Sequence, residues 1–352
     1  MARKRESPDQ DSRPVVRMKD IARDLAVSVV TVSKVVRNHS DIGAETRDRV
    51  LKRIKELNYK PNPAARALVT GRTYSIGFIV PDLVHPFFGE VAKGISQVLR
   101  TKGYSLLISS SEENPELERK EIEQLLARRV DALLIASTQS TIGTFRQIEE
   151  RNTPYVLIDR QFYGLSANFV GVDDKAVGDL ATEHLIAAGY RRIAHIRGSE
   201  VSTALGRLEG YRRALARNNL ALPAEYVVAA RASDEAGYVS GYQAMLKLVR
   251  LDPRPDAVFC YNDSTAMGAM KAIVQAGLRM PDDIAVIGCG NEWYAPALRV
   301  PLSSVDQQSV CIGQRAAKVA VSLVGSKGAP VRPKIVLLQP KVIVRESTSR
   351  SR

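Results

Sequence analysis

Apolar and polar side chains alternate with a helical period in the first 60 residues of the chain. Apolar side chains recur three and four positions apart in three short stretches, at Met18, Ile21, Ala22 and Leu25, at Val32, Val35 and Val36, and at Val50, Ile54 and Leu57. This spacing predicts three short helices, each with one apolar face. Only two residues separate the first stretch from Ser28, and serine is a favoured residue at the N-terminus of a helix. Two helices joined this tightly are typical of a helix-turn-helix.

The pattern changes after Gly71 to apolar, β-branched runs of strand length. These runs lie at residues 74–82, 104–111, 130–137, 153–160, 191–198, 255–263 and 283–290. Amphipathic stretches with helical spacing separate the runs, and this alternation predicts an α/β fold with parallel strands and helices on both faces of each sheet. Seven or more such units exceed one doubly wound sheet, so we expect two sheets, with ligands at the carboxyl ends of their strands.

Composition and pattern together divide the chain into four segments. We predict a disordered basic tail at 1–16, a helical headpiece at 17–60, a hinge at 61–72 and the α/β region at 73–346. The hinge contains Pro63 and ends near Gly71, which predicts one helix too short to be stable alone. Residues 1–71 hold 16 Lys or Arg and 9 Asp or Glu, which is +7 of the net charge of +13. This basic excess predicts a polyanionic partner for the headpiece.

The sequence disfavours several other classes of protein. It has no run near the ~18 apolar residues that a membrane span needs, and its start, MARKRESPDQDSRP, lacks the apolar stretch of a secretory signal. We therefore expect a cytoplasmic protein. Cys260, Cys289 and Cys311 are far apart, which predicts neither a disulfide nor a zinc site. The histidines lack metal-ligand spacing, and GxSxG, P-loop and GxGxxG motifs are missing. We predict no metal, no cofactor and no enzymatic activity.

The headpiece and hinge contain two diagnostic strings, IARDLAVSVVTVSKVVRN and ETRDRVLKRIKELNYKPNPAARAL. They resemble the corresponding parts of the LacI/GalR family of bacterial transcription regulators. The resemblance continues through PDLVHPFFGEVAKGI, GRLEGYRRAL, NDSTAMGAM and LRMPDDIAVIGCG. It implies a periplasmic-binding-protein-like effector domain with one lobe at about 73–172 plus 303–337 and the other at about 173–302 plus 338–346. It also implies a repressor that binds a palindromic operator as a homodimer and is controlled by a small molecule between the lobes.

Two other classes of protein could share part of this pattern. A solute-binding protein for transport shares the two-lobed fold, but the missing signal segment and the basic helices disfavour it. An enzyme on a doubly wound fold is disfavoured by the missing catalytic motifs. A gel shift with and without candidate metabolites distinguishes all three.

The second helix of the headpiece carries the predicted base contacts. Val30, Lys34 and Arg37 lie on a different face from its apolar stripe, so they can face the major groove. Lys34 is suited to guanine O6 and N7, and Val30 to a thymine methyl group. Val29 has two interpretations, because its spacing favours core packing whereas the matching family position reads bases. Phosphate contacts are expected from Thr31, Ser33 and Asn38, and the resemblance implies hinge contacts from Asn62, Ala65, Arg66 and the minor-groove wedge Leu68.

The resemblance also implies a set of effector-binding residues. They are Phe87, Phe88, Ser137, Asp159, Arg207, Asn262, Asp263 and Asn291. Alternatively, the two phenylalanines belong to the core, and Asp159 and Arg207 form an ion pair with each other. The family usually has Asn at the position of His85 and, in members that bind neutral sugars, Asp at the position of Gly290. The missing carboxylate leaves room for an anionic effector held by Arg207, such as a sugar acid or a phosphorylated sugar.

Overall fold

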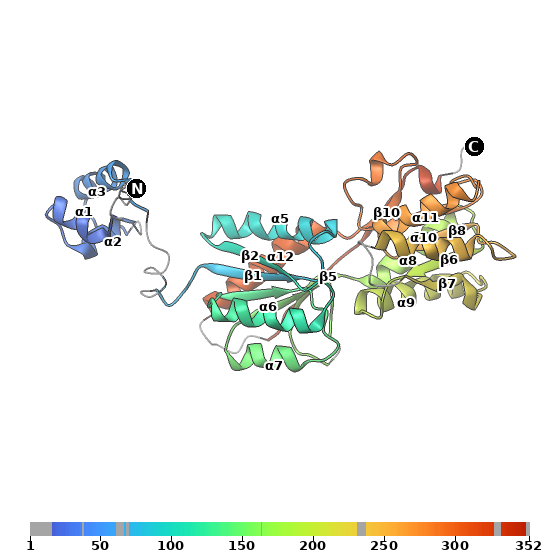
Figure 1. The fold of residues 1–352 in the computed structure, drawn as a ribbon, viewed down its shortest axis with the longest axis horizontal. Helices are drawn as coiled ribbons and strands as arrows, with labels where there is room; N and C mark the ends of the chain where they lie inside the picture. The colour runs from blue at the N-terminus through green and yellow to red at the C-terminus, as the bar shows by residue number, and fades with distance from the viewer. Residues whose placement is uncertain are drawn as a thin grey trace, which may run out of the picture. The chain divides into compact units, whose positions relative to one another are not determined.

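The computed structural model describes residues 16–36, 39–60, 67, 70–162, 164–230, 237–326 and 332–349. The chain forms two compact units, Met1–Thr73 and Tyr74–Arg352, and Figure 1 shows the fold of each. The boundary after Thr73 lies one residue beyond the predicted hinge. Almost the whole of the predicted tail and most of the hinge lie outside the described residues.

The small unit contains three helices in its described part. They are α1 (Met18–Asp24), α2 (Val29–Val36) and α3 (Ala44–Glu56). The predicted apolar faces meet in one core, whose buried members are Ile21, Ala22, Val32, Val35, Val50 and Tyr59. The Thr31 N–H donates to Ser28 Oγ at 3.0 Å, so Ser28 caps α2 as predicted. The helix-turn-helix is thus confirmed.

The first lobe of the large unit is built on a parallel sheet. In the described residues its six strands have the order β11-β5-β4-β3-β1-β2. Their bounds are β1 (Ser75–Val80), β2 (Ser105–Ser110), β3 (Ala132–Ile135), β4 (Tyr155–Ile158), β5 (Asn168–Val172) and β11 (Ile335–Leu338). One core cluster packs one face of the sheet against α5 (Pro86–Thr101) and α12 (Ser309–Gly325). A second cluster packs the other face against α6 (Pro115–Ala127) and α7 (Gly143–Glu150).

The second lobe repeats this architecture. The strand order in its described part is β12-β10-β9-β8-β6-β7, and β12 alone among these strands runs antiparallel to its neighbour. The strands are β6 (Ile193–Arg197), β7 (Val227–Ala229), β8 (Ala257–Cys260), β9 (Ala285–Cys289), β10 (Ser303–Asp306) and β12 (Lys341–Ile343). Helices α8 (Asp174–Ala187) and α9 (Ser202–Arg217) cover one face, and α10 (Tyr238–Leu248) and α11 (Asp263–Gln275) cover the other. The predicted α/β class with two sheets is therefore confirmed.

The chain passes between the lobes after β5, after β10 and after β11. The predicted division placed residues 303–337 in the first lobe, and the structure differs from it at β10. Ser303–Asp306 pairs in parallel with β9 and antiparallel with β12, so it belongs to the second sheet. The crossing therefore follows Asp306. Leu338, assigned by the prediction to the second lobe, is the last residue of β11 and pairs with Val172 of the first sheet.

Glycines permit close contact between the paired helices on the sheet faces. A Cβ atom on Gly94 of α5 would lie 2.1 Å from the Val310 carbonyl oxygen of α12, and a Cβ on Gly313 would lie 2.1 Å from that of Val91. Each backbone thus occupies the space of a side chain on its partner, and larger residues are excluded there. In the described residues no helix has the length and apolar character that crossing a membrane requires.

Candidate functional site

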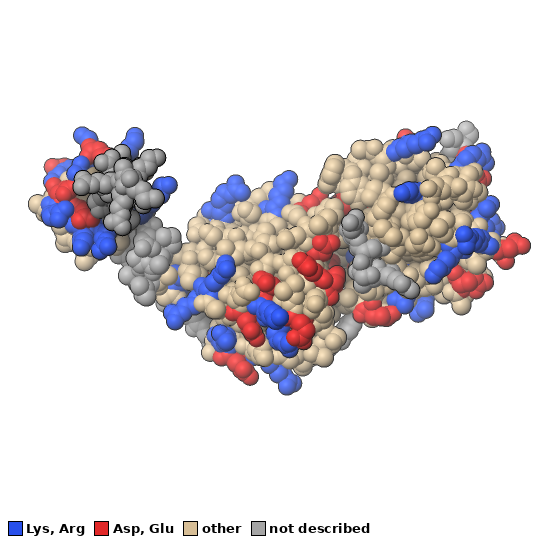
Figure 2. All heavy atoms as spheres, viewed as in Figure 1, with Lys and Arg blue, Asp and Glu red and all other residues tan. Residues whose placement is uncertain are grey.

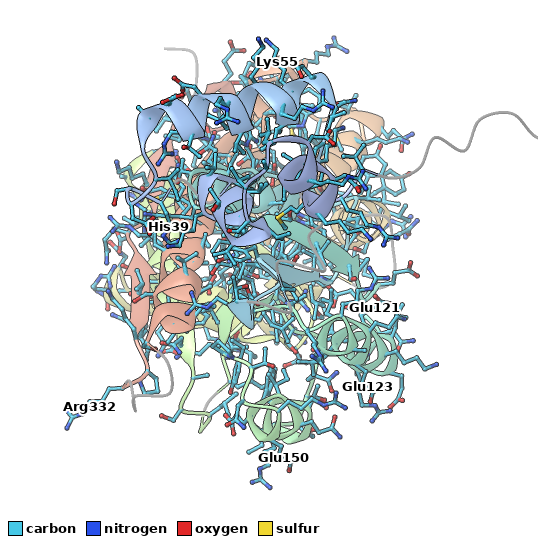
Figure 3. The ribbon with its side chains drawn as sticks, turned by 90° about the vertical axis from the view of Figure 1, so that its left-hand side faces the viewer. His39, Lys55, Glu121, Glu123, Glu150 and Arg332 are labelled. Carbon is cyan, nitrogen blue, oxygen red and sulfur yellow. The ribbon has the colours of Figure 1, made fainter. Side chains whose placement is uncertain are left out.

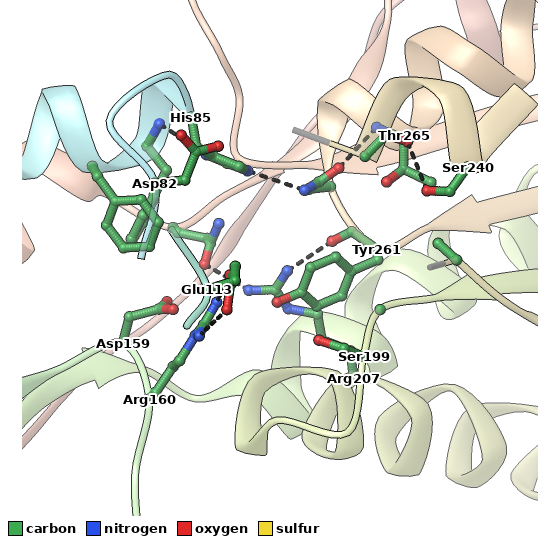
Figure 4. Close-up of a pocket in the computed structure, with 17 residues that line it drawn as sticks. Asp82, His85, Glu113, Asp159, Arg160, Ser199, Arg207, Ser240, Tyr261 and Thr265 are labelled. Atoms are coloured by element: carbon green, nitrogen blue, oxygen red, sulfur yellow. Dashed lines mark hydrogen bonds and ion pairs between the residues drawn. The ribbon is translucent and has the colours of Figure 1, made fainter. Parts of the chain in front are cut away.

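A cavity of about 110 Å³ opens where the carboxyl ends of strands from both lobes face each other (Figure 4). Its walls follow β1, β2 and β4 of the first lobe and β6, β7, β8 and β10 of the second. They comprise Asp82, His85, Phe87, Phe88, Glu113, Asp159, Arg160, Gly198, Ser199, Arg207, Ala230, Gly237, Ser240, Tyr261, Asn262, Thr265 and Gln307. Ligands of open parallel sheets bind at this edge because loops from several strands converge there. In this arrangement of the lobes the volume is below the roughly 300–1,000 Å³ of typical small-molecule pockets.

Aromatic rings form one wall of the cavity. Phe87 and Phe88 begin α5 and pack edge to face, with ring centroids 5.1 Å apart. His85 caps this helix, since the Phe87 N–H donates to its Nδ1 atom at 3.3 Å. Burial lowers the pKa of His85 to about 4, so the ring is neutral at pH 7. The two phenylalanines are buried against the first-lobe core and also line the cavity, so packing in the core does not exclude them from the cavity wall.

The lobes touch across the cavity at polar side chains. The Nε2 atom of His85 lies 3.0 Å from the amide nitrogen of Asn262. Asn262 caps α11, because its Oδ1 atom accepts from the Thr265 N–H at 2.8 Å. The Gln161 N–H donates to Ser202 Oγ at 2.9 Å, which is another contact between the lobes. The cavity wall thus depends on how the lobes are arranged.

Arg207 is buried in the cavity wall and held by the protein itself. Its Nε–H donates to Asp174 Oδ1 at 3.0 Å, and its two Nη groups donate to the Tyr261 carbonyl at 2.7 Å and to Gln307 Oε1 at 2.8 Å. Its guanidinium carbon also lies 4.6 Å from the centroid of the Tyr261 ring. The ion pair of Arg207 is therefore with Asp174 and not, as the alternative interpretation had it, with Asp159.

Arg160 is likewise paired. Its Nη1 group donates to Glu113 Oε2 at 2.9 Å, and its Nη2 group donates to the other oxygen of the same carboxylate. This two-pronged geometry is the strongest that arginine makes with a carboxylate. Both arginines in the cavity wall are therefore neutralised by carboxylates of the chain.

Asp159 differs from the other carboxylates of the cavity. It follows β4 with a left-handed backbone (φ 64°) and is only 8% exposed. No described residue donates a hydrogen bond to its carboxylate, which carries no dashed line in Figure 4. Burial raises its pKa above the ordinary value, against the opposing effect of Arg207 and Arg160. Asp159 is therefore an acceptor without a protein donor in the described residues.

Three residues that the sequence assigned to the effector lie away from the cavity wall. Ser137 donates to Glu118 Oε1 inside the first lobe. Asp263 is fully buried and accepts from Ser304 Oγ at 2.6 Å and from a backbone N–H at 2.8 Å. The Asn291 amide oxygen accepts from Arg345 Nη2 at 2.6 Å. These side chains turn into their own lobes, where protein partners satisfy them, so in this arrangement of the lobes they do not line the cavity.

Sequence reasoning did not assign several wall residues to the site. Among them are Glu113, Arg160, Tyr261 and Gln307. All four lie just after strands, as the expected carboxyl-end site requires. Position after a strand was therefore the usable signal, and it would have included Arg160 and Tyr261 as neighbours of residues already chosen.

The small unit presents the predicted DNA-contacting face of α2. Val29 and Val30 are 46% and 61% exposed, so Val29 is outside the core and its base-reading interpretation is the one compatible with the fold. Thr31 and Ser33 are partly exposed, and Lys34 Nζ forms an ion pair with Asp41. The other DNA contacts expected from the sequence lie outside the described residues, namely Arg37, Asn38, Asn62, Ala65, Arg66 and Leu68.

Comparisons with known proteins agree with both units. The family "Bacterial regulatory proteins, lacI family" matches residues 17–62, and "Periplasmic binding protein-like domain" matches residues 182–348. The HTH-type transcriptional repressor PurR of Histophilus somni (strain 129Pt) is 32% identical over 334 residues, which are 94% of this chain and 98% of that protein. The ribose operon repressor of Haemophilus influenzae is 34% identical over 331 residues, again 94% and 98% of the two chains.

Solved structures show the same similarity. The lac repressor dimer bound to operator and the anti-inducer ONPF has a TM-score of 0.84 and 26% identity, covering 96% of this chain and all of that one. The complex of the regulator CelR with cellobiose has a TM-score of 0.71 and 28% identity, covering 95% and 100%. These relatives are transcriptional regulators and not enzymes. The helix-turn-helix, the two-lobed effector unit and full-length similarity to repressors establish that the chain belongs to the LacI family of DNA-binding transcriptional regulators.

Proposed function

We propose that this protein is a repressor that binds a palindromic operator as a homodimer and responds to a small, neutral, polyhydroxylated effector in the cavity between its lobes. The observation that carries the proposal is the cavity itself, which combines an aromatic wall, paired arginines and one acceptor without a donor. Effector binding changes the lobe arrangement, and that change alters operator affinity through the hinges of the two subunits.

The charges in the wall support a neutral effector over the anionic one that Gly290 suggested. Two arginines and three carboxylates line the cavity in the described residues, and each arginine has a carboxylate partner. An anion would face Asp159 and would have to compete for guanidinium groups that are already neutralised. Adjacent hydroxyl groups can instead donate to Asp159 and accept from Asn262, while the C–H face of a sugar ring packs on Phe87 and Phe88.

A thermal-shift series with matched ligands tests the effector class. D-Ribose and D-glucose are compared with D-ribose 5-phosphate and D-gluconate on the purified full-length protein. A neutral ligand at 100 times its Kd stabilises the folded form by about 2.7 kcal/mol, or roughly 5–10 °C for a unit of this size. Shifts confined to the phosphorylated or acidic members of the series would refute the neutral class.

An exposed apolar groove of about 980 Å³ on the large unit supports the homodimer. Its wall includes Val84 and Val274, which are 75% and 51% exposed, together with Met267 and Met270. A continuous apolar surface of this kind marks a protein interface, and a two-fold axis presents two headpieces to a palindromic site. The second copy of the chain is the occupant that the operator geometry requires.

Sedimentation equilibrium measures this interface directly. Val274→Asp should place a charge in the groove and convert the dimer to a monomer. Leu205→Asp is the matched control, because Leu205 is 44% exposed on α9 and does not line the groove. Equal dimerisation of the wild type and Val274→Asp would refute the assignment of this surface.

DNA binding is tested with an operator selected from a random library. Figure 2 shows Lys and Arg side chains on the visible face of the small unit. Neutralisation of phosphates by such side chains makes log K fall by about 0.9 per phosphate for each tenfold increase in salt. A flat salt response, or equal affinity for random and selected sequences, would contradict operator binding.

A further inference from the structure

Glu292 places a carboxylate between the lobes, outside the effector cavity. It follows β9 of the second lobe and is 2% exposed. The loop that carries Glu292 lies beside the start of α5 in the first lobe, because Pro86 and Tyr294 line the same groove, and the Phe87 backbone N–H acts electrostatically on the Glu292 carboxylate. Its Oε2 atom is buried without a partner among the described residues. A buried carboxylate oxygen without a donor is costly when ionised, and it is uncommon in a folded protein.

Gly290 makes room for this side chain. A Cβ atom on Gly290 would lie 3.0 Å from Glu292 Oε1 and 3.3 Å from its Cγ atom, and the backbone there has a φ of +133°. The loop therefore lacks a side chain at 290 and supplies a carboxylate two residues later.

The charged groups nearest to Glu292 are themselves acidic. Glu90 of α5 and Asp263 of α11 both act on it electrostatically. The Tyr294 hydroxyl on the same loop is also coupled to it. Two negative neighbours from two different elements oppose ionisation of the Glu292 carboxyl.

The nearest basic groups do not offset this effect. Arg345, which follows β12, donates to the Asn291 amide oxygen and the Leu302 carbonyl, and its charge acts on Asp263. His85 accepts the Phe87 N–H at its Nδ1 atom and is neutral at pH 7. No described cation forms an ion pair with Glu292.

The protonation state of Glu292 therefore depends on whether the lobes are in contact. In this arrangement burial and the two carboxylates raise its pKa to about 8, against the smaller effect of the Phe87 N–H. Separation of the lobes hydrates the side chain and returns its pKa to the ordinary range of about 4.3. The joined arrangement thus binds one more proton at neutral pH.

We propose that Glu292 links the contact between the lobes to pH, so that the contact forms with the protonated carboxyl and loosens when the proton is lost. The sign follows from linkage. When the lobes are in contact, the pKa of this carboxyl is raised, so the contact is most stable at low pH, where the carboxyl is protonated. The contact loses stability progressively as the pH rises toward 8. The proposal concerns how the proposed effector site is regulated. It rests on the proposed function in one respect, namely that the two lobes move relative to each other.

Hydrogen–deuterium exchange on the full-length protein, without effector or DNA, tests the proposal. The variants are Glu292→Gln, which keeps the shape and removes the charge, and Glu123→Gln as a matched control. Glu123 is exposed on α6, which packs on the opposite face of the first sheet from α5, and Figure 3 shows its side chain at the edge of the ribbon. The amide exchange rate of residues 86–91 in the wild type is divided by the rate in Glu292→Gln at each pH. This ratio cancels the intrinsic effect of pH on exchange.

We expect a ratio near one at pH 4, below the ordinary pKa of the carboxyl, rising by up to about tenfold per pH unit toward pH 8. Glu123→Gln should behave like the wild type. Glu90→Gln removes one negative neighbour and lowers the pKa of Glu292 in the joined state, so exchange in this variant should level off at a lower pH than in the wild type. This comparison keeps the test decisive if Glu292→Gln fails to fold. A ratio independent of pH would overturn the proposal, and so would an equal rise in α6, which indicates general destabilisation. Because no ligand or operator is used, these outcomes are independent of the proposed function.

Discussion

Removal of Arg207 should destabilise the free protein, because this side chain holds the cavity wall together. The guanidinium is 3% exposed and bridges three groups from different segments, namely Asp174, the Tyr261 carbonyl and Gln307. Arg207→Ala leaves Asp174 buried without its cation. Breaking a buried pair in this way costs about 3–5 kcal/mol, which corresponds to roughly 6–20 °C in Tm for a unit of this size.

The penalty should also depend on pH. Burial raises the pKa of Asp174 to about 7, while Arg207 opposes the rise. In Arg207→Ala the carboxyl loses that opposing charge, so its pKa rises further and folding must keep a proton on it. Above pH 7 the difference from the wild type should therefore grow by up to about 1.4 kcal/mol per pH unit.

Differential scanning calorimetry at pH 6, 7 and 8 measures both effects. Arg217→Ala is the matched control, because Arg217 is 49% exposed and pairs on the surface with Asp179 and Glu183. Exposed pairs contribute about 0–1 kcal/mol. Arg207→Lys should recover only part of the loss, since an ammonium group cannot bridge the same three acceptors. An Arg207→Ala variant as stable as the wild type would refute a structural role and return Arg207 to a purely ligand-directed one.

Three further predictions follow from particular contacts. Asp159→Asn should raise the apo Tm slightly, because it removes a buried charge without a described donor, and it should abolish the thermal shift caused by the effector; a preserved shift would exclude Asp159 as a ligand. Lys34→Ala should weaken operator binding by about 1–3 kcal/mol per base contact and relax the sequence preference at one base pair of each half-site. Equal weakening of all sequences in a binding-site selection would instead indicate a phosphate contact. Gly94→Ala should destabilise the fold by about 1–3 kcal/mol, because its Cβ atom would meet the Val310 carbonyl. Gly89→Ala on the same helix is the control, since its Cβ atom would meet nothing within 4 Å and the variant should be more stable by about 0.5–1 kcal/mol. Equal Tm changes in the two variants would refute the close-contact argument.

The amino-acid sequence determined the local structure of this protein. Spacings of three and four among Val32, Val35 and Val36 predicted the buried face of α2, and the apolar runs marked seven of the strands at the positions observed. Local periodicity succeeds because burial of one face is what stabilises each element. The predicted runs did not include β5, β7, β10, β11 and β12. Four of these strands have short or interrupted apolar runs, whereas β11 is as apolar as β4, and the sheet pairing defines all five.

The sequence also located the edge of the sheets at which the cavity forms. The sequence assigns to the effector site five residues that line the cavity, namely Phe87, Phe88, Asp159, Arg207 and Asn262. Carboxyl ends of parallel strands must meet at one edge, so residues that follow strands converge whatever the loop paths are. The headpiece string was sufficient to indicate the family for the same local reason, since a helix-turn-helix is encoded within one short segment.

Only the tertiary structure decided which polar groups meet. Arg207 pairs with Asp174 because α8 and α9 approach closely, and they can do so because Gly178 has no side chain to strike the Arg207 carbonyl. Asp263 also follows a strand, yet its carboxylate turns inward to Ser304. The partner of a polar side chain depends on loop paths and helix packing, and these are set by contacts between residues far apart in the chain. Periodicity records which face of an element is buried, whereas the three-dimensional fold determines which charges are neutralised there.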